Sequence, residues 1–432
     1  MSRGLAFLSM AMLLSGCMQG MTGDGSLSER LSSARLGLAS EQNEDTTTIE
    51  PSAIIQSLQS CSSAIRPGTA YATIAAATLA SDARVAEAEL RAARLRSAAT
   101  DKNWMPSIGP AISLTSLGDM VANLVVEAVI FDNGKKKAER AMARAEVEVA
   151  AVSLVSDGNE RVYEALDLYL TALEGGESQR LNREALLDMR RFRWIMNERV
   201  KGGVSDMSDL TILAQKIAEI ENSMKDALDK RDTALAELSA MTDRDLSDLN
   251  GIGALDMSAG NIETLGVVAA KVQSKRDQAA ADMERAGNLP SIVASASGGS
   301  NDVVGGIRTE GLFDFGRKDR NQALDAEEEV LARRVKEAEE ASQRKIRSYE
   351  AKLTAAQRAY QEAVRLSKQA KSNLDLFQSQ YEAGQRQVMD VVGVYETFAR
   401  QQHTMNTQRF LAAKYEVLIA REYGVLVAGK QL

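Results

Sequence analysis

The longest regular pattern in the chain runs from about 318 to 383 and has the period of an α-helix. This tract contains no proline, and glycine first returns at Gly384. Its apolar residues recur in alternating steps of four and three, with Ser367 filling one position: Tyr349, Leu353, Ala356, Tyr360, Ala363, Ala370, Leu374 and Phe377. This heptad spacing is typical of a helix packed along a coiled-coil seam. At about 1.5 Å per residue the helix is about 100 Å long, which is more than the width of an ordinary globular core. On this tract alone, a solvated coiled coil is the simplest interpretation.

A second tract of the same kind occurs earlier in the chain. A Phe-Asp-x-Gly-Lys/Arg junction precedes each tract, with its aspartate and glycine at Asp132 and Gly134 and again at Asp314 and Gly316. A glycine-containing turn follows each tract, at Gly203 and Gly384. The interval is 69 residues from Gly134 to Gly203 and 68 residues from Gly316 to Gly384. An internal repeat is stronger evidence for the architecture of a chain than local sequence signals are. We therefore predict a duplicated fold.

Each repeat is expected to contain a helix, two strands, a long helix and a shorter helix. For the first repeat, 70–245, the expected ranges are 71–100, 112–117, 121–131, 135–200 and 204–241. For the second repeat, 246–432, they are 262–286, 292–297, 303–313, 318–383 and 385–426. The five prolines lie outside the four helices that follow the strands, as uninterrupted helices require. The lengths suggest that two stacked shorter helices pack beside each long one.

Residues 121–131 alternate in the manner of a strand. One face is wholly apolar and consists of Ala122, Leu124, Val126, Ala128 and Ile130. The other face is mixed and includes Asn123 and Glu127. Such a pattern is typical of a membrane barrel strand, and equally of a half-buried hairpin in a soluble protein. In the second repeat Arg308 and Glu310 occupy the positions that match Val126 and Ala128, which leaves the corresponding face undefined.

The N-terminus has the pattern of a targeting segment. Arg3 precedes an apolar stretch, and Leu14-Ser15-Gly16-Cys17 follows it. This run resembles a bacterial lipoprotein lipobox, which implies a signal peptide at 1–16 and acylation of Cys17. The alternative is an ordinary signal peptide with an incidental cysteine. Met18, in place of aspartate, favours the outer membrane. We expect 17–69 to be a lipidated tether that is largely extended or partly disordered.

Composition and motifs argue against several classes of protein. The net charge of -8 argues against a nucleic-acid partner. The only histidine, His403, lies in a helical tract, and the GxxxxGK[ST], HExxH and GxSxG motifs are absent. We therefore predict no catalytic site, no cofactor and no metal site. Beyond the N-terminus no apolar run reaches about 20 residues, so no transmembrane helix is expected.

With its duplicated order, its junction motif and the run Tyr381-x-x-Gly384-x-Arg386-x-x-x-Asp390-Val391, the sequence resembles the TolC-like outer-membrane efflux protein family. The resemblance covers about 70–428. It implies a mainly α fold with a small β part, in which antiparallel coiled coils extend into the periplasm. In that family three protomers contribute their strands to one barrel and their helices to one tunnel. Open strand edges are not tolerated in lipid, which agrees with closure by a homotrimer.

The resemblance also implies roles for single residues. Gly203 and Gly384 fall at helical hairpin tips, where glycine adopts positive φ readily. In the family the tips form the closed periplasmic entrance and the docking surface for an adaptor protein. Asp390 matches a position that contributes to a carboxylate ring, and Arg386 matches a neighbouring arginine. Alternatively, Asp390 simply caps its helix. Gly393 stands where a second ring carboxylate is expected, which argues against a double acidic ring.

The function implied is an outer-membrane exit duct of a tripartite efflux or type I secretion system. Its partners are then the periplasmic adaptor, an inner-membrane pump and outer-membrane lipid. The alternative is a periplasmic coiled-coil scaffold or adaptor lipoprotein. A scaffold explains the long helices but leaves two strand pairs at equivalent positions without a purpose.

Overall fold

A computed structural model describes residues 52–80, 85–114, 120–257, 263–299, 302–310 and 316–429. The predicted fold class is confirmed, because these residues form long helices and one small antiparallel sheet. The predicted signal peptide, Cys17 and most of the predicted tether lie outside the described residues. The boundaries of the two repeats stay a prediction.

The elements follow one another in the same order twice. The first set consists of α4 (Val85–Thr100), β1 (Ser107–Leu114), β2 (Met120–Phe131), α5 (Lys135–Lys201) and α6 (Met207–Thr242). The second set consists of α7 (Leu265–Gly287), β3 (Ser291–Gly299), β4 (Asp302–Glu310), α8 (Arg317–Glu382) and α9 (Val388–Tyr423). The long helices α5 and α8 contain 67 and 66 residues, and α6 and α9 contain 36 each.

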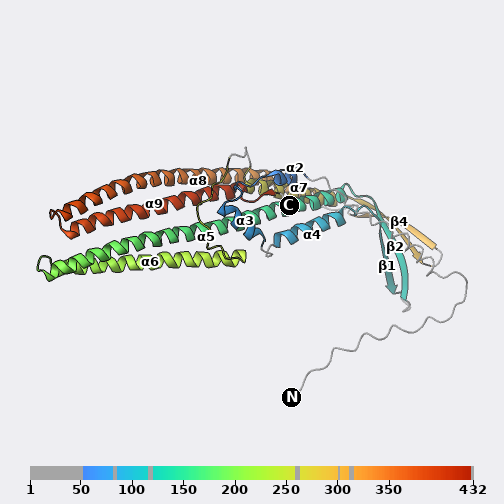
Figure 1. Cartoon of the computed structure of the whole chain (residues 1–432). Helices are drawn as coiled ribbons and strands as arrows, with labels where there is room; N and C mark the ends of the chain where they lie inside the picture. The colour runs from blue at the N-terminus through green and yellow to red at the C-terminus, as the bar shows by residue number, and fades with distance from the viewer. Residues whose placement is uncertain are drawn as a thin grey trace, which may run out of the picture. The chain divides into compact units, whose positions relative to one another are not determined.

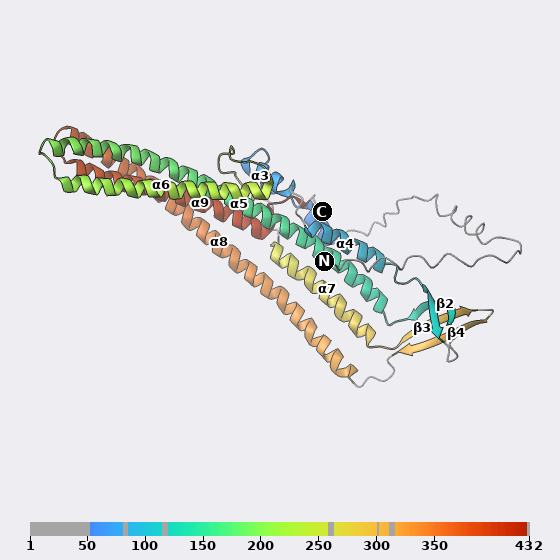
Figure 2. The same cartoon turned by 90° about the horizontal axis from the view of Figure 1, so that it is seen from below.

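Each long helix is flanked by two shorter helices. α4 and α6 pack against α5, and α7 and α9 pack against α8, which agrees with the stacking expected from the helix lengths. α5 also contacts α7 and α9, so the two repeats share one helical layer. Figures 1 and 2 show the α5/α6 and α8/α9 hairpins at one end of this layer and the sheet at the other. Within the described residues, no helix is both long enough and apolar enough to cross a membrane.

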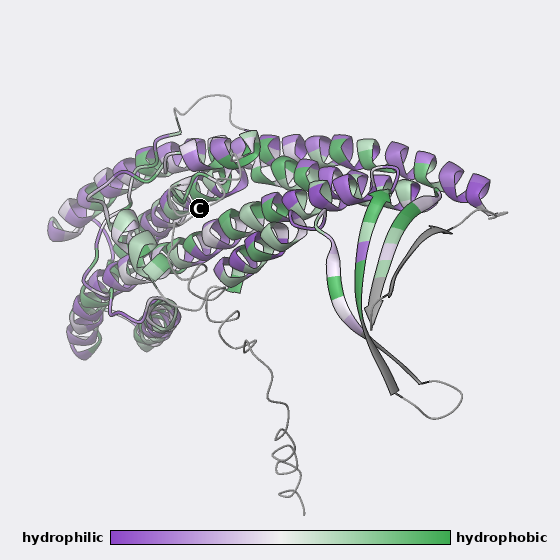
Figure 3. Cartoon of the chain, turned by 90° about the vertical axis from the view of Figure 1, so that its right-hand side faces the viewer, coloured by the Kyte–Doolittle hydropathy of each residue, from purple (hydrophilic) through white to green (hydrophobic). Residues whose placement is uncertain are grey.

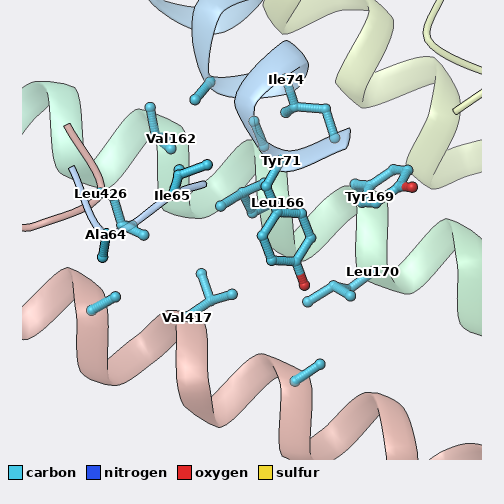
Figure 4. Packing of buried hydrophobic residues seen from close by; sticks show 14 of the residues in the cluster. Ala64, Ile65, Tyr71, Ile74, Val162, Leu166, Tyr169, Leu170, Val417 and Leu426 are labelled. Carbon is cyan, nitrogen blue, oxygen red and sulfur yellow. The ribbon is translucent and has the colours of Figure 1, made fainter. Parts of the chain in front are cut away.

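The main hydrophobic core surrounds the middle of α5 (Figure 4). Tyr71, from α3 (Ala70–Ala80), is buried there with Leu166 of α5 and Val417 of α9. The rings of Tyr71 and Tyr169 meet edge to face with centroids 6.3 Å apart, a favoured aromatic geometry. Because its residues come from both sets of elements, this core joins the two repeats.

The segment 71–100 is two helices, whereas one was expected. α3 packs against α5 and α6, whereas α4 packs mainly against α5. The two helices therefore pack at different places on the helical layer. Positions 81–84, between them, lie outside the described residues.

The predicted tether also differs from the structure in its last part. Residues 53–60 form a helix, α2 (Ala53–Ser60), with the Ser52 hydroxyl accepting from the Ile55 N–H at 3.3 Å. Ile55 and Leu58 are buried, in clusters that include residues of α5. Farther on, the Ala64 N–H donates to the Val425 carbonyl at 2.7 Å. Buried apolar side chains and backbone hydrogen bonds thus hold this segment against the rest of the chain.

The sheet has the order β1-β2-β3-β4, and all neighbours are antiparallel. β1 begins at Ser107, five residues before the predicted start, and it contains Pro110. Proline is tolerated more readily in edge strands than in central ones, and β1 is an edge strand of this four-stranded sheet. β1 and β4 are the open edges of this sheet.

Candidate functional site

The two helical hairpins turn in the same way at their tips. In the first, the Gly203 N–H donates to the Val200 carbonyl at 3.0 Å and the Val204 N–H to the Arg199 carbonyl at 2.9 Å. In the second, the equivalent bonds run from Gly384 to Tyr381 at 2.9 Å and from Gln385 to Gln380 at 2.9 Å. These are the two bonds of a Schellman motif. Gly203 and Gly384 have φ of +71° and +76°, the left-handed conformation that glycine adopts without strain.

The returning helices are capped differently. α6 begins after Asp206, whose side chain accepts from the Ser208 N–H at 3.3 Å. α9 begins after Gln387 with a capping box, in which the Asp390 carboxylate accepts from the Gln387 N–H at 3.2 Å. Asp390 is exposed and lies in the first turn, where the helix dipole favours a negative charge. The capping role considered for Asp390 is therefore present in the structure.

An arginine spans each tip with a side-chain hydrogen bond. Arg386 donates to the Gln380 side chain at 3.1 Å, and its guanidinium lies 4.5 Å from the centroid of the Phe377 ring. In the first hairpin Arg199 donates to the Ser205 hydroxyl at 3.2 Å. The two tip glycines are 181 residues apart, and with this offset Arg199 corresponds to Gln380 and Ser205 to Arg386. The same two positions are bonded in both hairpins, with donor and acceptor exchanged.

A second hydrophobic core lies behind the tips and joins the two hairpins. Its most buried members come from all four helices: Met189, Leu213, Leu374, Val388 and Val392. Tyr395 of α9 packs edge to face on Phe192 of α5, with centroids 6.0 Å apart. Burial raises the pKa of the Tyr395 hydroxyl, and its hydrogen bond to Asp188 raises that pKa further. Lys216 of α6 forms an ion pair with Glu396 of α9, a second connection between the hairpins.

The strand-to-helix junctions differ between the repeats. At the first, the Asp132 carboxylate accepts from the Gly134 N–H at 3.1 Å and from the Lys136 N–H at 2.7 Å, which satisfies two N–H groups at the start of α5. Gly134 has φ of +88°. At the second, Gly316 has φ of -85°, and Asp314 lies outside the described residues. The shared motif therefore does not impose one backbone conformation.

The register gives the sheet one apolar face. Val126 pairs with Ile108 and with Ala296, and Ala128 pairs with Ala294. Leu124 lies on the same face, and Ile108 and Leu124 are 66% and 56% exposed. Figure 3 shows hydrophobic residues along β2, with the sheet standing apart from the helices. Partners across antiparallel strands share a face, so the predicted alternation of β2 continues into both neighbours.

The register also assigns the positions that the sequence left open. On the opposite face, Glu127 pairs with Ser107 and Ser295. In the β3–β4 register, position 308 pairs with Val293, and position 307 pairs with Ala294. The position of Arg308 therefore belongs with Glu127, and not with Val126 as the offset between the repeats suggested. An irregularity between Val129 and Phe131 shifts the β2–β3 register. A constant offset between the two repeats does not allow for this shift.

Two features of the structure were not predicted from the sequence. The Asn103 side chain, just after α4, donates to Glu139 at 2.8 Å and accepts from Arg140 at 2.6 Å, and so ties α4 to α5. Leu187 and Trp194 of α5 are exposed, although both lie in a helical tract with a well-formed core. Their spacing of seven residues was visible in the sequence, but only the fold shows which side of α5 they occupy.

The comparisons with known proteins agree with this geometry. No protein-family model and no curated protein matches the chain. Among solved structures, it is similar to the outer membrane protein VceC from Vibrio cholerae, with 14% identity and a TM-score of 0.71 over 82% of this chain and 96% of that one. It is also similar to the CmeC outer membrane channel of Campylobacter jejuni, with 12% identity and a TM-score of 0.69 over 83% and 86% of the two chains.

A third similar structure is the open state of the MtrE outer membrane channel of Neisseria gonorrhoeae, with 15% identity and a TM-score of 0.68 over 82% of this chain and 89% of that one. All three likenesses cover most of each compared chain. The resemblance to the TolC-like family is thus confirmed at the level of the fold: this chain has the fold of these outer-membrane proteins.

Proposed function

We propose that this chain is the protomer of a trimeric outer-membrane channel, the exit duct of a tripartite efflux or type I secretion system. The four-stranded sheet carries the proposal. β1 and β4 have unpaired edges, and neither edge can stay open inside a bilayer. Pairing of β4 of one copy with β1 of the next closes the sheet, and a closed ring of copies leaves no edge.

The apolar face of the sheet supports the membrane position. Exposed Ile108 and Leu124 find an apolar environment in lipid, whereas the face with Glu127 and Ser295 is suited to a water-filled interior. The lipid-facing positions from the first three strands then include Ile108, Leu124, Val126, Ala128, Ala294 and Ala296. Acylation at Cys17 anchors the same chain from its N-terminus.

The hairpins then extend into the periplasm, where they meet an adaptor protein that connects the channel to an inner-membrane pump. Threefold symmetry brings three copies of Asp390 near one axis at the hairpin tips. Three carboxylates so arranged repel one another and attract cations. Arg386, which stacks on Phe377, holds the tip of its own hairpin beside this entrance.

Membrane extraction and mass measurement test the assembly. Protein extracted in detergent is expected to have the mass of three protomers and to conduct ions in planar bilayers. Replacing Cys17 by serine is the matched control, because it removes the acyl anchor and leaves the sheet intact. The Cys17→Ser protein should stay in the membrane fraction after a carbonate wash. Release of this variant, or a monomer that remains stable in bilayers, would contradict the channel and favour a lipid-anchored periplasmic scaffold.

A further inference from the structure

The outer side of α5 carries two large apolar side chains that nothing covers in the described part of the chain. Leu187 is 63% exposed and Trp194 is 66% exposed. They lie on the side of α5 opposite its buried residues, which include Ala185, Met189 and Phe192. Their separation of two helical turns is the spacing at which one helix presents a seam to another. We call this pair the α5 ridge.

The charges beside the α5 ridge are mainly positive. Arg183 and Arg191 lie four residues from Leu187 on either side, are exposed, and have no ion pair among the described residues. The acidic side chains of the same stretch are already engaged: Glu184 with Arg180 at 2.5 Å, Glu198 with Lys201 at 2.8 Å, and Asp188 with Tyr395. The ridge therefore offers apolar area with unneutralised positive charge next to it.

The second hairpin has no such ridge. With the offset of the tip glycines, Leu187 corresponds to Lys368 and Trp194 to Asp375, both exposed on α8. Asp375 forms an ion pair with Lys371 at 2.6 Å. The helix α8, which is one residue shorter than α5 and ends in the same kind of turn, thus has charged residues at these positions. The fold does not require the ridge, which argues that the ridge serves an interaction.

We propose that the α5 ridge docks an amphipathic helix of a partner protein whose apolar seam is flanked by acidic residues. The heptad spacing fits a helix, and the flanking arginines fit carboxylates across a polar rim. The inference rests on the proposed function, since it names the chemistry of the periplasmic partner. It also assigns the main contact to the first hairpin of each protomer, so the two hairpins are not equivalent docking sites.

The helix α8 of a second copy of this chain fits the ridge less well. The exposed apolar side chain nearest the tip on α8 is Leu376, at 54%. Its helical neighbours at three and four residues are Ser372, Asn373, Ser379 and Gln380, none of which is acidic. Val330 of α8 is also exposed, but Arg333 and Arg334 flank it on one side. Neither surface offers an apolar seam with carboxylates on both sides.

Trp194 is itself the probe for this proposal. The chain has two tryptophans, so Trp104→Phe leaves Trp194 as the only indole. The protein is reconstituted in lipid nanodiscs, which leaves no free detergent to bind a peptide. The probe is a synthetic two-helix coiled coil with one exposed leucine seam flanked by glutamates. The control peptide has lysines in place of those glutamates.

The emission of Trp194 is expected to be that of a water-exposed, acrylamide-quenchable indole, and to shift to the blue when the glutamate peptide is added. The lysine peptide should bind at least about tenfold more weakly, and Leu187→Ala should weaken the glutamate peptide about tenfold, as for a hot-spot contact. Arg191→Glu should lower the affinity for the glutamate peptide and raise it for the lysine peptide. Leu376→Ala, on α8, is the matched control and should leave both affinities unchanged.

Three results would overturn the proposal. A Trp194 that is shielded before any peptide is added would make the ridge a contact between copies. Equal binding of the two peptides would remove the charge argument, and equal effects of Leu187→Ala and Leu376→Ala would remove the difference between hairpins. Conductance of the same samples separates the two proposals. A conducting assembly without peptide binding contradicts the ridge alone, whereas peptide binding without conductance contradicts the channel.

Discussion

The hairpins α5/α6 and α8/α9 have nearly the same backbone and different side-chain chemistry. Their lengths agree to one residue, and both turn at a glycine with left-handed φ. The first hairpin carries the α5 ridge, and the second carries the capping box of Asp390. Local turn chemistry and heptad spacing suffice to build a hairpin of this length. The surfaces and caps are free to differ, and in these two hairpins they do differ.

The interiors of the hairpins differ as well. α5 contains Gly175 and Gly176, whereas α8 has Ala356 and Gln357 at the corresponding positions. A Cβ added at Gly175 would lie 2.9 Å from the Ala227 carbonyl oxygen and 3.0 Å from the Arg231 nitrogen, both in the backbone of α6. The absence of a side chain at Gly175 lets α6 approach α5 closely. The α8/α9 pair reaches its packing with alanine at the same level.

The largest effect is therefore expected from Gly175→Ala. The added methyl meets backbone atoms that cannot rotate away, so α6 must shift, and we expect a loss of about 1–3 kcal/mol in the free energy of unfolding. Gly176→Ala is the control, because a Cβ there has only the flexible Arg231 side chain within reach, at 3.6 Å. It should be neutral or stabilising by up to about 1 kcal/mol through helix propensity. Denaturant unfolding of both variants measures the difference, and equal stabilities would show that close approach is not required.

The tips should respond alike in the two hairpins. Gly203→Ala and Gly384→Ala each place a Cβ on a residue with left-handed φ, and we expect each to lower the free energy of unfolding by about 1 kcal/mol. Gly202→Ala tests the neighbouring position, where φ is -81° and alanine fits without strain. Thermal unfolding of the three variants compares them. A cost at one tip and none at the other would mean that the tips are equivalent in geometry but not in stability.

Much of this fold follows from the sequence because its signals are local and repeated. The tract 318–383 was predicted within one residue of α8, since nothing interrupts its heptad spacing. The tip glycines were predicted because few other residues adopt left-handed φ. The break between α3 and α4 was not predicted, because α3 is apolar around most of its circumference and has no helical face to read.

Interactions between distant parts of the chain were beyond the sequence. The ion pair of Lys216 with Glu396 joins residues 180 positions apart, and no spacing rule relates them. The face of Arg308 depends on an irregularity in the β2–β3 pairing, which changes the offset between the repeats. The cap of Asp390 is local, and the sequence predicts it as one of two roles for this residue. Its place near a threefold axis depends on assembly and stays a proposal.

The smallest change in stability, and the sharpest difference between hairpins, is expected from Asp390. Asp390→Ala removes one half of the capping box and should cost about 0.5–1 kcal/mol in the free energy of unfolding. Asp390→Asn keeps an oxygen that can accept from the Gln387 N–H, so it should retain most of that stability while losing the charge. If three carboxylates surround the entrance, both variants should weaken block by divalent cations in planar-bilayer recordings. If Asp390 only caps its helix, Asp390→Ala alone should change the protein, through its lower stability.

Asp209, six residues past Gly203, is the equivalent acid of the first hairpin, and Asp209→Asn should leave the block unchanged. Equal loss of block from Asp209→Asn and Asp390→Asn would place both hairpin tips at the axis and remove this difference between them.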